Sequence, residues 1–322
     1  MSKYLAVCIV AIISIHFLAV HGTIRSGFEI DSETALGEAL FFDPILSIDS
    51  SVSCASCHKP EFAFADTVAI SPGVNNIRGV RNAPTLMNVS SRNLLFYDGR
   101  ANSLAQQVHF PIEEETEMNM PLDELITRLK ESSKYSPWFK LVYEDGVSAE
   151  NVASCIAAYE RTLLTNETPF ESYKKGELSA LSEAAIKGRK IFMSEKAKCF
   201  DCHFNSDFTG DEFKNIGLFD AQKYTDSGRY MITGDSSDIG KFRVPSLINI
   251  SVTAPYMHDG SVTTLHDVID YYDKPFSFVE NPINADSAAI RPIGFTKEEK
   301  TNLIAFLEAL TDYRFIGKSP KR

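Results

Sequence analysis

Two copies of one motif organise the chain: Cys54-Ala55-Ser56-Cys57-His58 and Cys199-Phe200-Asp201-Cys202-His203. Each copy has the C-x-x-C-H pattern, which is the attachment signal for a c-type haem. The cysteines bond to the porphyrin and the histidine becomes an axial ligand of the iron. A C-x-x-C pair also supplies half of a zinc site, but zinc does not require a histidine directly after each pair. The sequence therefore predicts two haem c groups, held by Cys54, Cys57 and His58 and by Cys199, Cys202 and His203.

The composition is that of an ordinary soluble globular protein, with 322 residues, 44% of them hydrophobic and 23% charged. A chain of this length is expected to form about two domains. The formal net charge of −11 argues against binding to nucleic acid or to an anionic membrane surface. It suits a basic partner such as a small electron carrier, although solubility alone explains the same charge.

Residues 1–22 predict a secretory signal peptide. Lys3 gives a short positive region, an apolar run covers residues 4–20, and Gly22 offers a small residue for cleavage before Thr23. The run is long for a signal peptide and slightly short for a membrane span, so an uncleaved anchor is a second interpretation. Because haem c is attached outside the cytoplasm, both interpretations predict export to the periplasm.

The cysteine count agrees with this reading. Four of the six cysteines belong to the haem motifs, and Cys8 lies within the predicted signal peptide. Cys155 remains in a helical pattern and is expected to be a buried apolar residue. No structural disulfide is predicted for the mature chain.

The two motifs have similar surroundings in the sequence. Each half of the chain is expected to end with a helix, over 149–164 in the first half and from about 297 to 310 in the second. Thr296 and Glu299 form a capping box at the start of the second closing helix. Similar segments with helical apolar spacing precede the motifs: Gly37-Glu38-Ala39-Leu40-Phe41 and Gly188-Arg189-Lys190-Ile191-Phe192.

The order of helix, motif, loops and helix is that of a cytochrome c domain, and it occurs twice. A polar stretch over 166–179 marks the boundary, so we expect an N-terminal domain over 23–168 and a C-terminal domain over 169–322. Segments rich in Gly, Asp, Ser and Asn at 70–79 and 209–240 are expected to be loops over the haem edges. The expected fold class is mainly α, with few short strands and two tandem cytochrome c-type domains, each with one covalently bound haem.

Further stretches stand out in combination: Arg81-Asn82-Ala83-Pro84-Thr85, Tyr97-Asp98-Gly99-Arg100-Ala101, Gln107, Glu117-Met118, Tyr159-Glu160-Arg161-Thr162-Leu163, Val244-Pro245-Ser246-Leu247 and Thr253-Ala254-Pro255-Tyr256-Met257-His258-Asp259-Gly260. Together they resemble the bacterial di-haem cytochrome c peroxidase and MauG family over about residues 30–312. The resemblance implies a protein that reacts with peroxide at the N-terminal haem.

The resemblance also implies a peroxide site. In the family an aromatic residue, a Gln and a Glu recur at fixed spacing, and Tyr97, Gln107 and Glu117 match it here. Gln107 is implied to position peroxide, and Glu117 to move the proton that O–O cleavage requires. A carboxylate over an apolar haem has a raised pKa, which suits this role. Without the family spacing, the alternative is that Glu117 is a solvated charge next to the acidic run 113–115.

The expected axial ligands differ between the two irons. Family members that need reductive activation carry a His before the R-N-A-P-T stretch, but no His occurs between Lys59 and Val108. The N-terminal iron is therefore expected to lack a protein ligand opposite His58, with His109 as the alternative ligand.

At the C-terminal haem the resemblance implies a second ligand fourteen residues after the His of the P-Y-x-H motif, which is Tyr272 here. Packing of this tyrosine, with His258 or Met257 as ligand, is the alternative. Tyr97 matches an aromatic residue that the family places between the haems. It is implied to relay electrons, and a purely structural Tyr97 is the alternative.

The family holds a calcium ion between its haems. The matching oxygen donors are the side chain of Asn82 and the backbone carbonyls of Thr253 and Pro255. Arginines that pair well with carboxylates are candidates for the haem propionates, with ordinary salt bridges as the alternative. These arginines are Arg81, Arg100 and Arg243.

The predicted function is that of an exported di-haem c-type peroxidase. It would reduce hydrogen peroxide at the N-terminal haem, with electrons passed through the C-terminal haem from a small cytochrome c or cupredoxin. One alternative is a MauG-like enzyme that oxidises side chains of a protein substrate through a high-valent di-haem state. Another is a non-catalytic di-haem electron-transfer cytochrome. A homodimer fits each reading.

Overall fold

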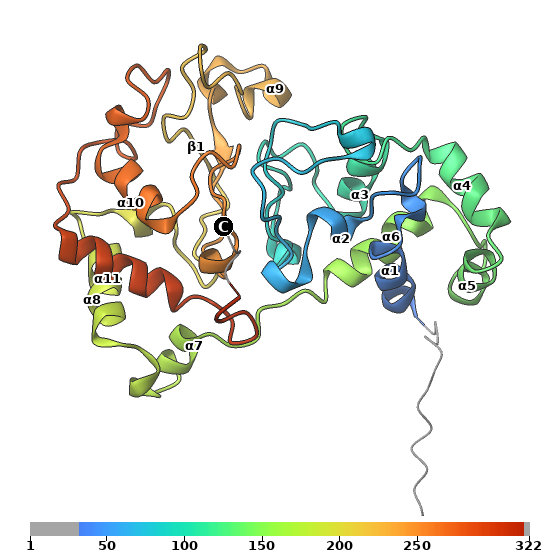
Figure 1. Cartoon of the computed structure of the whole chain (residues 1–322), viewed down its shortest axis with the longest axis horizontal. Coiled ribbons are helices and arrows are strands. Elements are labelled where there is room, and N and C mark those ends of the chain that lie inside the picture. Colours follow the sequence, from blue (N-terminus) through green and yellow to red (C-terminus); the bar gives the residue numbers. More distant parts are fainter. Residues whose placement is uncertain (1–31, 319–322) are drawn as a thin grey trace, which may run out of the picture.

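The computed structural model describes residues 32–318 and folds them into two halves joined by an extended connection (Figure 1). The predicted signal peptide and its alternative, an uncleaved anchor, lie outside the described residues. Within the described part of the chain, no helix is long and apolar enough to cross a membrane.

The N-terminal half contains α1 (Glu33–Phe41), α2 (Cys54–Cys57), α3 (Leu104–Glu113), α4 (Leu122–Glu131), α5 (Tyr135–Val142) and α6 (Ala149–Glu160). The C-terminal half contains α7 (Pro169–Lys174), α8 (Glu183–Phe192), α9 (Tyr230–Thr233), α10 (Leu265–Asp273) and α11 (Lys297–Glu308). Among residues 32–318 the strands are β1 (Phe213–Lys214) and β2 (Phe242–Arg243), which pair antiparallel. The expectation of a mainly helical fold with few strands is confirmed.

Hydroxyl caps define where the helices of each half begin. Ser32 and Ser182 accept backbone N–H bonds at the starts of α1 and α8, at 3.2 and 3.1 Å. The predicted capping box at α11 is confirmed, because Thr296 accepts the Glu299 N–H and the Glu299 carboxylate accepts the Thr296 N–H. Side-chain acceptors satisfy N–H groups that a first helical turn leaves unpaired.

Two details of the sequence-based elements need correction. The first closing helix ends at Glu160 rather than at residue 164, because the Thr162 hydroxyl donates to the Tyr159 carbonyl at 2.7 Å and competes with the helical pattern. The loop expected over 209–240 contains β1 and α9. β1 forms through pairing with a segment about 30 residues away, which local composition does not reveal.

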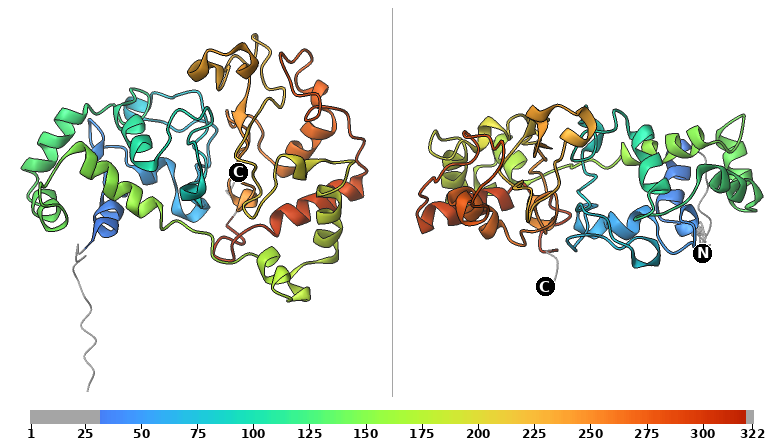
Figure 2. Two further views of the ribbon diagram at one scale, coloured as in Figure 1. Left: turned by 180° about the vertical axis from the view of Figure 1, so that it is seen from behind. Right: turned by 90° about the horizontal axis from the view of Figure 1, so that it is seen from above.

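In each half a glycine lets the helix before the C-x-x-C-H motif cross closely with the last helix of that half. A Cβ atom on Gly37 of α1 would lie 1.8 Å from the carbonyl oxygen of Cys155 on α6. A Cβ atom on Gly188 of α8 would lie 1.8 Å from the carbonyl oxygen of Asn302 on α11. The helix pairs α1/α6 and α8/α11 lie side by side in both views of the ribbon (Figures 1 and 2). The two halves are therefore built on the same contact.

Ion pairs join the halves across their interface. Arg81 donates to both carboxylate oxygens of Asp226, at 2.7 and 2.9 Å, and Arg92 pairs with Asp207 at 3.0 Å. The backbone N–H of Arg243 donates to the carbonyl of Tyr97 at 2.8 Å. Charge-assisted bonds of this kind are the stronger class of hydrogen bonds and fix geometry as well as energy.

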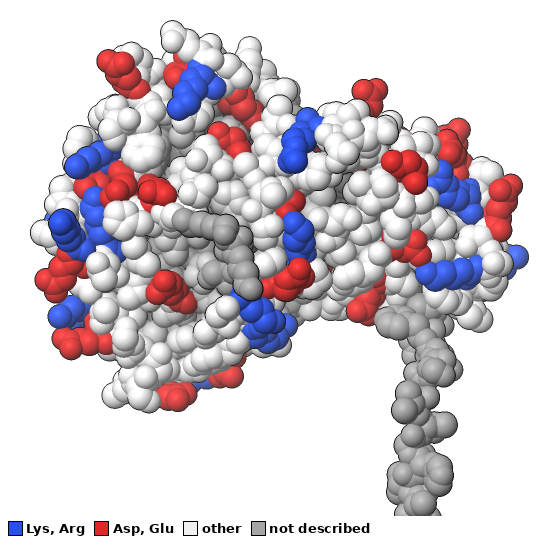
Figure 3. Space-filling model, in the orientation of Figure 1, with Lys and Arg blue, Asp and Glu red and all other residues white. Residues whose placement is uncertain are grey.

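The surface charges are mixed. On the face drawn in Figure 3, Lys and Arg side chains alternate with Asp and Glu side chains over both halves. The net charge of −11 is therefore not gathered into one acidic patch on this face. A mixed surface of this kind is compatible with solubility alone.

The helix crossing makes a prediction about Gly188. Helix propensity alone would make Gly188→Ala stabilising by about 1 kcal/mol. The collision with the Asn302 carbonyl instead predicts a loss of about 3 kcal/mol in the free energy of unfolding, because backbone cannot yield as a side chain can. Urea denaturation measures the difference, with exposed Lys187→Ala on the same helix as the control. A stabilised Gly188→Ala protein would show that the crossing is loose.

Candidate functional site

Each C-x-x-C-H motif forms one helical turn. The N–H of His58 donates to the Cys54 carbonyl at 2.8 Å, and the N–H of His203 donates to the Cys199 carbonyl at 2.9 Å. This winding puts the two cysteines of each motif on one side of the turn, three residues apart. Ser53 starts the first turn as part of a capping box. The motifs thus present both thiols and the following histidine as a unit.

Both motif histidines are held in the same tautomer. The Nδ1 atom of His58 lies 3.1 Å from the carbonyl oxygen of Phe64, and that of His203 lies 2.9 Å from the carbonyl oxygen of Phe208. A carbonyl only accepts, so each Nδ1 carries the hydrogen and each Nε2 keeps a free lone pair. Burial lowers the pKa of both histidines, which favours the neutral form. This is the arrangement of a metal-ligating histidine, so the residues fit a haem iron.

The carbonyls that hold these histidines come from strained residues. Phe64 has φ 56° and Phe208 has φ 52°, which is the left-handed region that few non-glycine residues adopt. In each half the chain reverses here and turns one carbonyl back toward the motif. Strain of this kind persists only when the surrounding structure fixes it, and it clusters at functional sites.

A cavity of about 340 Å³ lies over the second motif. Its volume is within the range of ligand pockets, and many of its lining side chains are apolar. Asn82 and Tyr97 enter it from the N-terminal half. The other lining residues include Cys199, Cys202, His203, Leu218, Phe242, Val244, Leu265, Ile269, Tyr272, Leu303 and Leu307. Two thiols, one histidine with a free Nε2 and apolar walls fit a covalently bound haem.

Two adjacent tyrosines on α10 have different environments. Tyr271 donates its hydroxyl to the carbonyl of Ile216, whereas Tyr272 lines the cavity. Burial raises the pKa of Tyr272, and the charges of Cys199 and Cys202 add to the rise, so its hydroxyl lies near the motif. Tyr271 is therefore held by its hydrogen bond to Ile216, whereas Tyr272 lines the cavity.

The alternative ligands also line this cavity. The ring of His258 stacks on Phe242 with centroids 3.8 Å apart, and its backbone carbonyl accepts the N–H of Asn82 at 2.7 Å. Met257 is partly buried and packs against the core of the C-terminal half. His258 thus has a structural contact on one ring face, while both residues border the same space as Tyr272.

The segment after α3 brings Glu117 to the first motif. The N–H groups of Met118 and Met120 donate back to Pro111 and Ile112, at 3.1 and 2.7 Å, so the chain doubles over the end of α3. Burial raises the pKa of Glu117, and Arg100 opposes the rise. This is the direction expected from the sequence.

The charge of Glu117 helps to raise the pKa of both thiols of the first motif. Burial is the main cause that raises the pKa of Cys54, and it raises that of Cys57 to about 11; Glu117 adds to both. The carboxyl of Glu117 is therefore close to the motif, although Glu117 is an exposed residue and solvent weakens the effect of its surroundings on its pKa. Gln107 lies half-buried on α3, the helix over which the Glu117 segment folds.

The three candidate propionate arginines make ion pairs with protein carboxylates. Arg81 is shared between Asp226 and Asp98, the latter at 2.5 Å. Arg100 pairs with Asp98 at 2.9 Å and stacks 3.5 Å above the ring of Phe96. Arg243 lines the cavity and lies 3.6 Å from a carboxylate oxygen of Asp211. Their role toward propionates stays a prediction.

The predicted calcium donors Asn82, Thr253 and Pro255 all line the same cavity. The Asn82 amide donates to the carbonyls of Val68 and Ala69, at 3.1 Å each, which fixes the orientation of its oxygen. Within residues 32–318 no group of three or more His, Cys, Asp or Glu side chains is placed to hold a metal ion. The two C-x-x-C pairs therefore do not meet in one zinc site, and a calcium ion would depend on amide and carbonyl oxygens.

Comparison with known proteins gives consistent matches. Residues 31–179 match the family described as di-haem cytochrome c peroxidase. The chain is 36% identical to the methylamine utilization protein MauG of Methylorubrum extorquens over 282 residues, which cover 86% of this chain and 78% of that protein. It is 36% identical to the cytochrome c551 peroxidase of Pseudomonas aeruginosa, covering 90% and 80%. The crystal structure of a MauG-like protein associated with microbial copper homeostasis superimposes with a TM-score of 0.78 at 31% identity, covering 88% and 92%.

The structure adds Glu160, a residue that the sequence did not single out for a role. Only 4% of Glu160 is exposed, and its Oε2 atom has no hydrogen-bond partner. Burial raises its pKa to about 8, and its charge adds to the raised pKa of Cys54, so it lies beside the first motif. An acidic residue at the end of the buried face of α6 was the available signal.

Glu160 predicts a pH dependence of stability. Its pKa is about 8 in the folded protein and near its ordinary 4.5 when unfolded. Between these values the folded state holds a proton that the unfolded state has lost, so stability falls as pH rises, by about 1.4 kcal/mol per unit at most. Glu160→Gln should flatten this slope and raise stability near pH 7 by up to about 3 kcal/mol. Urea denaturation from about pH 5 to pH 8 tests this.

Glu150→Gln is the matched control, since Glu150 is an exposed carboxyl on the same helix. The control should keep the slope of the unmodified protein. Parallel slopes for Glu160→Gln and the unmodified protein would mean that the Glu160 carboxyl is ionised in the folded state.

Proposed function

The chain belongs to the di-haem cytochrome c peroxidase family, and we propose that it reduces hydrogen peroxide at an N-terminal haem with electrons passed through a C-terminal haem. The observation that carries the proposal is the pairing of Glu117, an exposed acid whose pKa is raised near the first motif, with a histidine that keeps a free Nε2. Export to the periplasm and one haem in each of the segments 23–168 and 169–322 are parts of the same proposal.

The chain supplies the ligands for both haems. Cys54, Cys57 and His58 would hold the first, and Cys199, Cys202, His203 and Tyr272 the second. When bound, the haem irons supply the electron transfer and the open coordination that peroxide reduction requires.

Glu117 and Gln107 handle the peroxide. The Glu117 carboxylate takes the proton from the oxygen nearer the metal and returns it to the departing oxygen, which leaves as water. Two electrons and two further protons complete the conversion of one peroxide to two water molecules. A raised pKa suits Glu117, because it makes the carboxylate a stronger base for holding the proton between the two transfers. The Gln107 amide orients the peroxide.

Tyr97 connects the two halves. It belongs to the N-terminal half but borders the cavity of the second motif, and its carbonyl accepts the N–H of Arg243. We assign it as an electron relay. Burial raises its pKa to about 12, so the phenol is protonated at neutral pH and must release its proton when it is oxidised.

One observation favours the MauG-like alternative. Position 272 on α10 is a tyrosine, and it lines the cavity of the second motif together with Met257. Because a phenolate is a hard anionic donor, it stabilises oxidised iron, which suits a protein that stores oxidising equivalents for a protein substrate. The reductant is then a side chain of that substrate instead of a small cytochrome c or cupredoxin. A calcium ion held by Asn82, Thr253 and Pro255 is proposed in either case.

Replacement of Glu117 tests the peroxidase proposal. Glu117→Gln keeps the shape but removes the base, so kcat for peroxide reduction should fall by about 100-fold or more. Stopped-flow mixing with peroxide measures this, and the haem absorption spectrum should be unchanged. Glu115→Gln in the same acidic run is the control and should react normally. A wild-type protein inert to peroxide would favour a non-catalytic electron-transfer cytochrome.

Replacement of Tyr272 tests the second ligand. Tyr272→Phe should change the low-spin ferric signal of the resting protein in low-temperature EPR. The matched variant Tyr271→Phe should leave that signal intact and cost about 1 kcal/mol of stability, because it removes only the bond to the Ile216 carbonyl. An unaltered low-spin signal in Tyr272→Phe would move the ligand assignment to His258 or Met257. The same spectrum should contain a high-spin signal from an N-terminal iron with no second protein ligand.

A further inference from the structure

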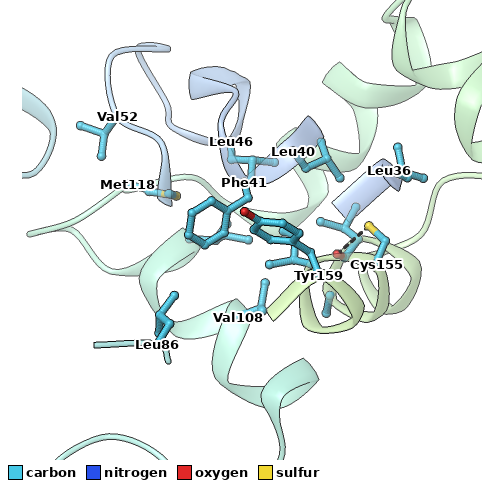
Figure 4. Packing of buried hydrophobic residues seen from close by; sticks show 14 of the residues in the cluster. Leu36, Leu40, Phe41, Leu46, Val52, Leu86, Val108, Met118, Cys155 and Tyr159 are labelled. Carbon is cyan, nitrogen blue, oxygen red and sulfur yellow. Dashed lines mark hydrogen bonds between the residues drawn. The ribbon is translucent and has the colours of Figure 1, made fainter. Parts of the chain in front are cut away.

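A row of aromatic rings leads from the first motif into the N-terminal core. The carbonyl of Phe64 holds His58, and the Phe64 ring lies 6.0 Å from that of Phe41. The Phe41 ring lies 5.1 Å from that of Tyr159. Figure 4 shows Phe41 and Tyr159 side by side at the centre of the packed core. Tyr159 is thus the first easily oxidised side chain along this row.

The next oxidisable groups follow on α6 and α5. Cys155 is one helical turn before Tyr159 and lies beside it in Figure 4. Cys155 and Tyr135 belong to the same buried cluster of the N-terminal half, and the charge of Cys155 contributes to the raised pKa of Tyr135 after burial and Asp43. Tyr135 packs on α1 as Tyr159 does, and its hydroxyl reaches the Ala39 carbonyl at 3.3 Å. Both tyrosines therefore contact the last turn of α1, and Cys155 belongs to the same buried cluster.

Tyr135 has a proton acceptor in place. This fully buried phenol donates to a carboxylate oxygen of Asp43 at 2.6 Å. Hydrogen bonds from Lys134 and Tyr135 help to hold the pKa of Asp43 below its ordinary value against burial, so the carboxylate is ionised. Lys134 lies over the Tyr135 ring, which disfavours oxidation, but its charge is offset by Asp43 at 2.8 Å. Oxidation of Tyr135 can therefore release its proton without charging the core.

Trp138 continues the row to the surface. Its ring meets that of Tyr135 edge to face, with centroids 5.4 Å apart. It is half-buried on α5, and it is the only tryptophan of the chain. α5 lies at the outer end of the N-terminal half, away from the C-terminal half (Figure 1). The row thus leads in the opposite direction from Tyr97.

We propose that Trp138 is a surface site at which the protein oxidises external one-electron donors, connected to the N-terminal haem site through Tyr159, Cys155 and Tyr135. The inference rests on the proposed peroxide reaction, which supplies the oxidising equivalents. The substrate class is small outer-sphere donors that give up one electron at the protein surface.

The electron and proton balance closes on these residues. Tyr135 loses one electron toward the N-terminal haem site, and its phenolic proton moves to Asp43. An electron from Trp138 and the proton from Asp43 then restore Tyr135, while the indole keeps its N–H. One electron from the external donor restores Trp138. Two such cycles deliver the two electrons that one peroxide consumes.

A second tyrosine offers a rival end point. Tyr143 donates its hydroxyl to Glu33 at 2.7 Å, and Cys155 contributes to its raised pKa after burial and Glu33. Its stacking partner Phe139 is hard to oxidise, whereas Tyr135 contacts an indole. The geometry therefore favours the Trp138 branch, and the Tyr143 branch is an outcome that the experiment can detect.

The first experiment locates the oxidised residue. Holoenzyme is treated with peroxide without a donor and digested with trypsin, which cuts after Lys134 and Lys140 and releases residues 135–140 as one peptide. Mass spectrometry should find oxygen added to Trp138. Asp43→Asn keeps the turn but removes the base and should lower this modification by about 100-fold. Tyr135→Phe should also suppress it, and Tyr313→Phe in the other half is the control that leaves it unchanged.

The second experiment measures turnover with ferrocyanide as the donor. Trp138→Phe should lose most ferrocyanide oxidation, and Tyr143→Phe should retain it. Peroxide consumption by the unmodified protein with modification at Tyr143, or with none in peptide 135–140, overturns the Trp138 site while leaving the peroxidase proposal intact. An unmodified protein that does not consume peroxide overturns the peroxidase proposal and this inference with it.

Discussion

In each half, the close crossing between the helix before the motif and the last helix is the contact from which the site follows. Gly37 lets α1 rest directly on the Cys155 carbonyl, and Gly188 lets α8 rest on that of Asn302. A larger residue would push each pair apart, since no side chain stands between the backbones to yield. In the N-terminal half the same crossing fixes the end of α1, where Phe41 meets both Phe64 and Tyr159. The contact between α1 and α6 therefore also positions the aromatic side chains beside the first motif.

The two halves complete each other electrostatically. Asp98 is buried and accepts from Arg81 and Arg100, and Arg81 reaches on to Asp226 across the interface. A buried carboxylate is tolerated only when it is paired in this way. The result is that Tyr97, which directly precedes Asp98, is held at the border of the second cavity. Within this network, the Arg81–Asp226 pair is the one that neither half could form alone.

Local patterns allowed the helical class, the two haem motifs and the capping box at Thr296 to be predicted, because each of these depends on neighbouring residues. The features that the sequence did not reveal depend on distance or on backbone shape. Arg81 meets Asp226 across 145 residues, and no local pattern selects that partner from the other carboxylates. Phe64 and Phe208 turn their carbonyls toward the motifs because they adopt positive φ angles. A phenylalanine in the sequence does not indicate this backbone conformation, whereas a glycine would. The burial of Glu160 at the end of α6 depends on tertiary packing, which the local sequence does not show.

The two routes proposed for oxidising equivalents differ in where the proton goes. Tyr97 lies near Arg243 and Arg81, which cannot accept a proton, and Asp259 acts on it only through space. Tyr135 instead donates directly to Asp43, so its electron and proton can leave together. An oxidised Tyr97 must release its proton to solvent, because burial makes a retained positive charge costly. The inter-half route therefore suits rapid passage of an electron between two metals, whereas the Tyr135 route can store an oxidised residue long enough for a donor to arrive.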